Sequence, residues 1–428
     1  MSILPAAMRG ERRLAGNIFS LYILQGLNYI VPMAVLPYLV RVLGMNMYGL
    51  YAFAQSFALY FTLFTDYGFN FSATRSVAMK NDDREAVSRV FSSVLVIKLT
   101  FMLVGALVLV TVVDLVPRFH QNSAFFFVAY AAVIGNVLFP LWYFQGIEQM
   151  GYISGIVGIS RLLGAAALFG FVHHPTDALL ALAIQSAVPV VGGVAGLWVA
   201  FHKLKVRPSR PSAADVKATL VDGWHLFIST AAISLYTNTN VFLVGLLAGN
   251  VQAGYFSVAE KMVRALQGLF GPVTQAVFPH IANLAAKSRD AAVRFAVQML
   301  LWMGAASLAV SIGVLLLARP AVLLLFGHSA AGSLPVVRWI AFLPFVVTIS
   351  NVLGIQVMVP FGLDRQFSRI LFFAGLLNLA LAIPLIRLYT APGAGASVLV
   401  TEFIVAALMF LILRRHNVHL FHSMRVSA

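Results

Sequence analysis

Cysteine is absent from this 428-residue chain, and charged residues make up only 10% of it. The first absence excludes disulfides, thiolate metal sites and cysteine nucleophiles. The second excludes intrinsic disorder, and it argues against a soluble domain, which carries roughly 25% charged residues. Hydrophobic residues reach 61%, more apolar surface than a water-soluble exterior can hide. The composition therefore predicts an all-α polytopic membrane protein.

Recognisable catalytic motifs are missing as well. The sequence has no Gly-rich P-loop ending in Lys-Ser or Lys-Thr, no HExxH helix and no GxSxG elbow. The histidines are scattered, and the pair His173–His174 falls in an expected outer loop. We therefore expect a protein that is not an enzyme and has neither cofactor nor metal.

Long apolar runs account for most of the chain. A helix needs about 20 apolar residues to cross the hydrocarbon core of a bilayer, and twelve stretches have that length. The first is too long for a signal-peptide core, so we expect it to be retained. The expected spans are 16–40, 49–78, 90–114, 123–146, 153–173, 178–201, 223–247, 252–284, 295–317, 333–359, 367–387 and 393–413.

The net charge of +15 is distributed unevenly. With the N-terminus in the cytoplasm, 18 of the 29 Lys and Arg residues fall in cytoplasmic segments and only 4 in outer segments. The positive-inside rule produces this distribution. Both termini are therefore expected to be cytoplasmic, and the positive charge implies no nucleic-acid partner.

A basic segment divides the chain into halves. We expect an N-terminal six-helix lobe at 1–202, a basic cytoplasmic linker at 203–222, a C-terminal six-helix lobe at 223–414 and a cytoplasmic tail at 415–428. Residues 48–55 (YGLYAFAQ) resemble residues 253–260 (AGYFSVAE), at an offset of 205. Both halves hold an even number of spans, so the repeats run in the same direction, as in transporters built from parallel repeats.

Polar residues form stripes on equivalent helices of the two halves. At 100° per residue the stripe of each helix occupies one face, which predicts a shared central cavity. The polar residues are Gln55, Thr62, Asp66 and Asn70 in span two, Glu260, Arg264, Gln267 and Gln275 in span eight, Gln25 and Asn28 in span one, and Asn240 in span seven.

Ionisable residues inside a membrane cost roughly 2.5–3.5 kcal/mol each and are functional by default. Lys98 and Arg161 lie deep in spans three and five. Together with Arg264 they would make a cationic cavity that suits an anionic head group such as a pyrophosphate. Asp66 is either a site for a coupling H⁺ or Na⁺, or it neutralises Lys98 or Arg161.

Other charges in the spans have a functional and a structural interpretation. Arg75 and Lys261 are near enough to helix ends to extend to the interface. Glu260 and Arg264, four residues apart, fit an ion pair as well as a substrate site. Glu402 is alone in the last span, where it fits a hydrogen-bonded or protonated packing residue.

Several strings of the sequence resemble those of a known family. They are 24–29 (LQGLNY), 36–44 (LPYLVRVLG), 65–75 (TDYGFNFSATR), 142–148 (WYFQGIE), 236–243 (YTNTNVFL), and 254–261 (GYFSVAEK) followed by Arg264. In these strings the chain is similar to the polysaccharide transporter family, the Wzx-like O-antigen and exopolysaccharide flippases of the MATE-like MOP superfamily. The similarity covers most of residues 15–415, with three departures. Residues 45–48 (MNMY) stand where the family usually has a more polar turn that contains Pro or an acid, and Ser76 and Gln149 stand where it commonly has basic residues.

The resemblance implies a twelve-helix, two-lobed bundle in the bacterial inner membrane. It implies a flippase that moves undecaprenyl-pyrophosphate-linked oligosaccharide to the outer leaflet by ion-coupled alternating access. The implied partners are this lipid-linked substrate, a coupling ion (H⁺ or Na⁺), the bilayer, and other membrane proteins of polysaccharide assembly. The positions that match the family's motifs are Asp66, Asn70, Arg75, Glu148, Asn240, Glu260, Lys261 and Arg264.

Two alternatives to a flippase remain. A drug or metabolite antiporter of the same superfamily predicts a cavity dominated by acids, whereas the spans hold more Lys and Arg than acids. A membrane polymerase or ligase needs a sizeable outer domain, whereas no outer loop exceeds roughly 16 residues.

Overall fold

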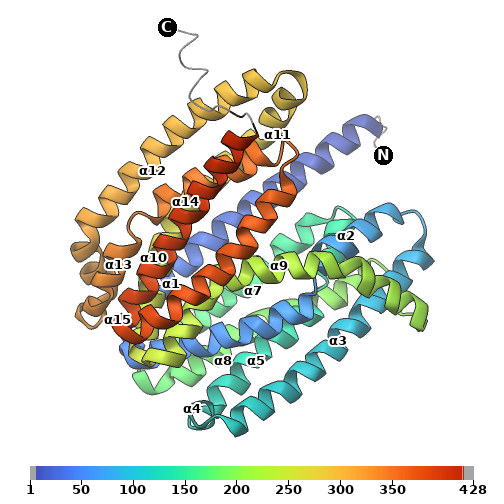
Figure 1. Cartoon of the computed structure of the whole chain (residues 1–428). Coiled ribbons are helices and arrows are strands. Elements are labelled where there is room, and N and C mark those ends of the chain that lie inside the picture. Colours follow the sequence, from blue (N-terminus) through green and yellow to red (C-terminus); the bar gives the residue numbers. More distant parts are fainter. Residues whose placement is uncertain (1–5, 417, 419–428) are drawn as a thin grey trace. The chain divides into compact units, whose positions relative to one another are not determined.

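The structure, a computed structural model, describes residues 6–416 and residue 418. Its description of side chains leaves out residues 6–25, 27–30, 229, 232, 233, 235, 236 and 276. Every regular element in the described part of the chain is helical (Figure 1). This confirms the all-α fold class.

The helices follow one another with short connections. The first half holds α1 (Ala6–Asp66), α2 (Phe69–Met79), α3 (Arg84–Leu115), α4 (Pro117–His120), α5 (Ser123–Leu138), α6 (Leu141–Gly146), α7 (Met150–Phe171), η1 (Pro175–Asp177), α8 (Ala178–Trp198) and η2 (Val199–Lys203). The second holds α9 (Ala213–Ala248), α10 (Asn250–Gln267), η3 (Gly268–Phe270), α11 (Gly271–Lys287), α12 (Arg289–Phe326), η4 (His328–Ser333), α13 (Leu334–Ile340), α14 (Leu343–Asn351), η5 (Val352–Met358) and α15 (Asp364–Arg415).

Eight stretches of the described residues are long and apolar enough to cross a membrane, against twelve expected. Two of the missing four are accounted for because α1 contains the first expected span and the start of the second, and α15 contains the last two. Each continues through one residue with non-helical backbone, Gly44 in α1 and Thr390 in α15. The other two, the expected spans seven and eight, correspond to α9 and to α10 with α11, which are not among the eight.

The expected span 49–78 is broken. α1 ends at Asp66 and α2 begins at Phe69, because Tyr67 (φ 42) and Gly68 (φ 74) adopt left-handed backbone. Residues in that conformation end an α-helix. The single polar face expected over this span is therefore wrong beyond Asp66, because Asn70 lies on a new helix.

Two further expected spans are divided. Pro140 separates α5 from α6, since proline lacks the amide N–H and disfavours helix in the residue before it. The expected span 252–284 becomes α10 and α11, joined by the 3₁₀ turn η3. The tighter turn changes the helical phase, and Gln275 on α11 is exposed.

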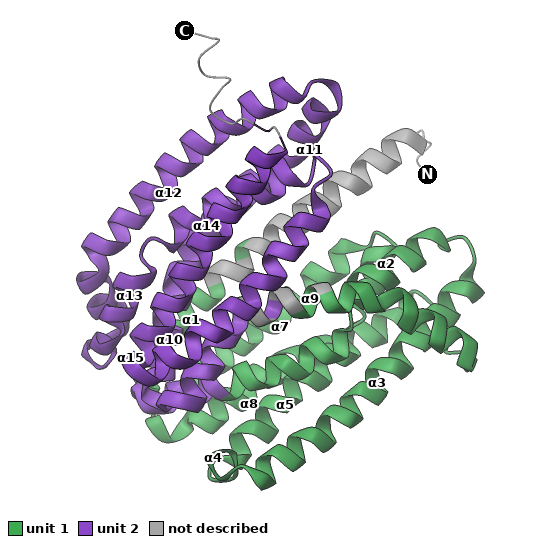
Figure 2. Ribbon diagram, viewed as in Figure 1, with its two compact units in different colours: residues 1–43, 54–231 green, residues 44–53, 232–428 purple. Residues whose placement is uncertain are grey.

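The described chain forms two compact units (Figure 2). Unit 1 runs up to Leu43 and from Ala54 to Ala231, and unit 2 comprises Gly44–Phe53 and the chain from Ala232 onward. The division falls inside α9, beyond the linker 203–222 that we expected to separate two lobes, and a short piece of α1 joins the second unit. The four-part division stays a prediction.

Small residues bring helices of unit 1 close together. A Cβ on Gly135 of α5 would lie 2.2 Å from the carbonyl carbon of Pro189 on α8, and one on Gly193 would lie 2.6 Å from the Gly135 oxygen. Helices in membranes associate through such close backbone approach.

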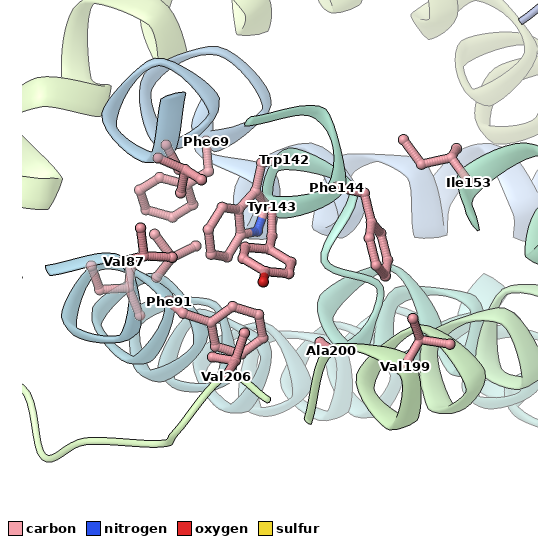
Figure 3. Packing of buried hydrophobic residues seen from close by; sticks show 14 of the residues in the cluster. Phe69, Val87, Phe91, Trp142, Tyr143, Phe144, Ile153, Val199, Ala200 and Val206 are labelled. Atoms are coloured by element: carbon pink, nitrogen blue, oxygen red, sulfur yellow. The ribbon is translucent and has the colours of Figure 1, made fainter. Parts of the chain in front are cut away.

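Aromatic rings fill the core where α2, α3 and α6 meet. The ring of Phe91 on α3 lies 5.4 Å from that of Trp142 and 5.3 Å from that of Tyr143, both on α6 (Figure 3). Phe69 belongs to the same buried cluster. Aromatic contacts of this kind add roughly 0.5–1.5 kcal/mol each beyond burial, so they fix the short α6 against its neighbours.

In unit 2, α10 crosses the piece of α1 that joins this unit. A Cβ on Gly49 would lie 1.8 Å from the carbonyl oxygen of Asn250, and one on Gly254 would lie 2.7 Å from that of Met45. Gly254 is Gly49 plus 205, and Asn250 is Met45 plus 205. The contact is therefore reciprocal, as across a twofold axis, and it follows the offset found in the sequence.

The loops before these helices repeat in the same way. Gly44 and Gly249, also 205 residues apart, both have positive φ, at 69° and 100°. Only glycine adopts such backbone readily. The internal repeat is thus present in the backbone of the chain as well as in its sequence.

Candidate functional site

A buried ion pair lies where α1, α3 and α5 meet in unit 1. Lys98 Nζ donates to Asp66 Oδ1 at 2.9 Å and to the carbonyl oxygen of Asn136 at 3.1 Å. The Lys98 side chain is 3% exposed and that of Asp66 is 28% exposed. An ammonium group removed from water needs such partners. Of the two interpretations left open for Asp66, the structure provides the contact that neutralises Lys98.

The other predicted residues of unit 1 lie on other elements, namely α2, α7 and the turn between α6 and α7. Arg161 is half-buried on α7, and Asn70 is half-buried at the start of α2. Arg75 on α2 is exposed and makes no ion pair with any described residue. Glu148 is exposed in the turn between α6 and α7, with left-handed backbone (φ 57).

A smaller cavity of unit 1, of about 110 Å³, lies between α2, α3 and the start of α9. Its lining carries charges of both signs, Lys80 and Arg89 beside Asp215 and Asp222. The hydroxyl and the backbone N–H of Ser212 both donate to Asp215 and hold the pKa of its carboxyl below the usual value. Charges of both signs therefore share this cavity, which lies on the expected cytoplasmic side.

In unit 2, Arg264 contacts Glu260 one helical turn earlier on α10. Arg264 Nε and Nη2 donate to Glu260 Oε1 at 3.1 Å and 2.9 Å, and Nη2 also donates to the carbonyl oxygen of Thr237. The Arg264 side chain is nevertheless 40% exposed, against 14% for Glu260. Because a guanidinium carries five N–H donors, this pairing leaves donors for a ligand.

Arg264 lies in the wall of a polar cavity of about 240 Å³. Gln267 lines this cavity together with Arg264, whereas Gln275 does not. Thr348 and Asn351 of α14 were missed, although their spacing of three residues in an apolar span marks one helical face. Helices α10, α11, α12 and α14 and the turn η3 form the wall through Arg264, Gln267, Gly268, Phe270, Gly271, Thr274, Met303, Thr348 and Asn351.

Lys261 is held beside Tyr48 rather than beside an acid. Its Nζ lies 3.3 Å from the Tyr48 hydroxyl and 5.6 Å from the centre of the ring. Tyr48 is fully buried and its hydroxyl lies 3.1 Å from Ser257 Oγ. Lys261 itself is exposed. Its ammonium group therefore stays accessible to solvent although it lies over the Tyr48 ring.

The remaining predicted polar residues have varied positions. Asn240 on α9 is 1% exposed, and its Oδ1 has no hydrogen-bond partner among the described residues. The side chains of Gln25 and Asn28 on α1 lie outside the described residues. Within the described part of the chain, no group of three or more His, Asp or Glu side chains is placed to hold a metal ion.

Comparison with known sequences decides the family. The profile of a family described as "Polysaccharide biosynthesis protein" matches residues 14–285. The chain belongs to this family. A protein of Escherichia coli (strain K12) named "Putative O-antigen transporter" is 35% identical over 401 residues, which cover 94% of this chain and 97% of that protein. A protein of Shigella dysenteriae with the same name is 28% identical over 398 residues, covering 92% and 98%.

Solved structures share the fold of this polysaccharide biosynthesis family member. A multidrug resistance MATE family transporter of the MOP superfamily, in an inward-facing conformation, has a TM-score of 0.69 at 14% identity and covers 96% of this chain. All of that transporter's chain is matched. The lipid II flippase MurJ, in an inward closed conformation, has a TM-score of 0.70 at 12% identity, covering 94% of this chain and 87% of its own. These likenesses show that the chain has the fold of these two transporters.

Proposed function

We propose that this protein is a flippase that moves undecaprenyl-pyrophosphate-linked oligosaccharide from the cytoplasmic to the outer leaflet of the bacterial inner membrane. The substrate would be an O-antigen or exopolysaccharide repeat unit. Two relatives that carry the name of O-antigen transporter align over nearly the whole chain. The observation that carries the proposal is the half-exposed Arg264 in the wall of a polar cavity.

The chemistry of this cavity suits such a head group. Several sugars and two phosphates cannot cross hydrocarbon unaided, because each polar group buried without a partner is costly. Arg264 has planar donors that match phosphate oxygens. Gln267, Thr274 and Asn351 offer the amide and hydroxyl groups that replace water around sugars. The polyprenyl tail stays in the lipid throughout.

We further propose alternating access coupled to an ion gradient of H⁺ or Na⁺. Asp66, partly exposed beside Lys98, is our candidate for the coupling carboxylate in unit 1, and Lys98 then acts by holding it. Arg161, Arg75, Lys261 and Asn70 remain proposed head-group contacts. An inside-negative potential of 100 mV contributes roughly 2.3 kcal/mol per charge toward moving an anion outward.

A cell-based experiment tests the function. Cells depleted of this protein should accumulate lipid-linked oligosaccharide on the cytoplasmic leaflet, and wild type should release the block. Arg264→Ala, present at normal levels, should not rescue, whereas Arg387→Ala, which removes an exposed arginine of α15 outside the cavity, should rescue fully. If depleted cells deliver the intermediate to the outer leaflet at the normal rate, the flippase proposal is wrong.

A drug or metabolite antiporter is the second candidate, because a multidrug transporter shares the fold over 96% of this chain. It predicts efflux of small cations driven by an ion gradient. The arginine in the cavity disfavours a cationic substrate. Drug resistance that depends on this protein, together with normal leaflet distribution of the oligosaccharide, would favour the antiporter.

A further inference from the structure

Glu402 is a buried carboxyl outside both the ion pair of unit 1 and the polar cavity of unit 2. It lies in the second arm of α15 and is 8% exposed. The kink at Thr390 and the basic residue Arg414 are each twelve residues away, about 18 Å along the helix at 1.5 Å per residue. Glu402 is therefore near the middle of its span, far from either helix end.

No cation compensates this carboxyl among the described residues. Its only hydrogen-bonding neighbour there is Ser350 of α14, whose Oγ lies 3.5 Å from Glu402 Oε2. Ser350 is itself 7% exposed. The contrast with Asp66 is direct, since Asp66 has the ammonium of Lys98 at 2.9 Å.

Among the contacts between described residues, the elements that pack most extensively on α15 are α10, α13, α14 and η5, and they supply no counter-charge. Helix α14 and η5 contain no titratable residue, and Arg338 of α13 is exposed. On α10, Glu260 and Arg264 pair with each other and Lys261 contacts Tyr48. The other charged or titratable residues of α15 lie near its ends or its kink: Asp364, Arg365, Arg369, Arg387, Tyr389, Arg414 and Arg415.

An ionised carboxylate in this setting is strongly disfavoured, because it has lost water and gained neither a cation nor a set of donors. The neutral acid suits the site, since it can share one hydrogen bond with a hydroxyl. We propose that Glu402 is a proton-binding site, which carries its proton in the conformation described here and exchanges it when α14 and α15 separate enough to admit water.

Helix α14 connects this site to the cavity. Thr348 and Asn351 of α14 line the cavity with Arg264, while Ser350, between them in sequence, contacts Glu402. A movement of α14 that follows head-group binding therefore alters the surroundings of Glu402. Two ligands that bias one element are thermodynamically coupled. That this coupling drives transport rests on the flippase function proposed above, whereas the protonation of Glu402 does not.

The protonated state is tested with N,N′-dicyclohexylcarbodiimide, an apolar reagent that modifies protonated carboxyls within membranes. The full chain in liposomes is treated over a series of pH values, and the modified peptides are identified by mass spectrometry. We expect modification at Glu402 that declines as the pH rises. Absence of modification at Glu402, or modification that does not change with pH, would overturn the proposal.

The coupling role is tested by transport of lipid-linked oligosaccharide across the same liposomes under an imposed pH gradient. Glu402→Gln keeps the shape of the side chain but cannot exchange a proton, and it should lose the response to the gradient. Asp364→Asn makes the same change at an exposed position of α15 and should keep the response. A Glu402→Gln variant that keeps the wild-type response overturns the coupling role. If the wild-type protein moves no oligosaccharide but Glu402 is still modified by the carbodiimide, the flippase function is refuted and the proton-binding site is retained.

Discussion

At the scale of single residues, the carboxylate of Asp66 compensates the buried charge of Lys98. Removing one partner of a buried ion pair leaves the other charge uncompensated, which costs about 3–5 kcal/mol. We therefore expect Lys98→Gln and Asp66→Asn each to lower the unfolding temperature of the purified protein, with Asp66→Asn the more damaging because it leaves the more deeply buried ammonium of Lys98 without its carboxylate. The double variant Asp66→Asn/Lys98→Gln removes both charges and should regain most of the loss. If the loss of unfolding temperature in the double variant equals the sum of the losses in the two single variants, the pairing is refuted.

Asp83 controls the start of α3 and makes that end sensitive to acid. Its Oδ1 accepts hydrogen bonds from the backbone N–H groups of Ala86 and Glu85, both at 3.0 Å. These bonds, first that from Ala86, hold the pKa of the carboxyl below its usual value. Because the folded-state pKa is the lower one, the cap stabilises fully above the unfolded pKa of about 4 and is lost as the pH falls through the folded pKa.

We expect Asp83→Ala to unfold at a lower temperature than wild type at neutral pH and to approach wild type in acid. Thermal unfolding in detergent at both pH values measures this. Asp82→Ala is the matched control, since Asp82 precedes the cap and accepts no hydrogen bond from a described residue. If Asp83→Ala lowers the unfolding temperature equally at both pH values, the acid sensitivity does not come from protonation of the Asp83 cap.

The pairing of Asp66 also marks what the sequence could not decide. Two cations, Lys98 and Arg161, were open as partners, and the choice depends on how α1 and α3 pack. That packing depends on the break after Asp66, where Tyr67 has positive φ. No local pattern predicts left-handed backbone at a tyrosine. Side-chain contacts between helices are therefore the part of the site that needed the structure.

At the scale of helices, the repeat is the feature that the sequence predicted best. Gly44 and Gly49 and their counterparts Gly249 and Gly254 were visible as matching letters, and they carry matching backbone and reciprocal contacts. Apolar length likewise located the spans. The length of an apolar run did not reveal the breaks inside a span. A run of apolar residues looks the same in sequence whether its helix is continuous or is interrupted by a turn within the membrane.

The crossing of α1 and α10 should tolerate no side chain at its two glycines. A methyl group at Gly49 would lie 1.8 Å from a backbone oxygen, which cannot move aside as a side chain can. We expect Gly49→Ala and Gly254→Ala to cost about 3 kcal/mol or more and to reduce folded protein in the membrane. Gly313→Ala on α12, where a Cβ meets nothing within 4 Å, is the control. Normal yield and unfolding temperature for Gly49→Ala would contradict the close crossing.

At the scale of the whole molecule, the charge distribution predicts orientation. The absence of cysteine provides a clean background for single-cysteine variants. In intact cells a membrane-impermeant thiol reagent should label Gln121→Cys, in an expected outer turn, and should not label Ala213→Cys, in the expected cytoplasmic segment before α9. Opening the cells should expose the second site. The reverse labelling would refute cytoplasmic termini.

The central claim is that this chain moves a lipid-linked, pyrophosphate-bearing oligosaccharide, with Arg264 contacting the anionic group. The most direct measurement reconstitutes the purified protein in liposomes with labelled lipid-linked oligosaccharide and follows how much becomes accessible at the opposite leaflet. The account predicts transfer with wild type, little with Arg264→Ala, and little with Arg264→Lys, because lysine cannot make the planar two-donor contact. Transfer that is equal in all three, or absent with wild type while small drugs are moved, would contradict it.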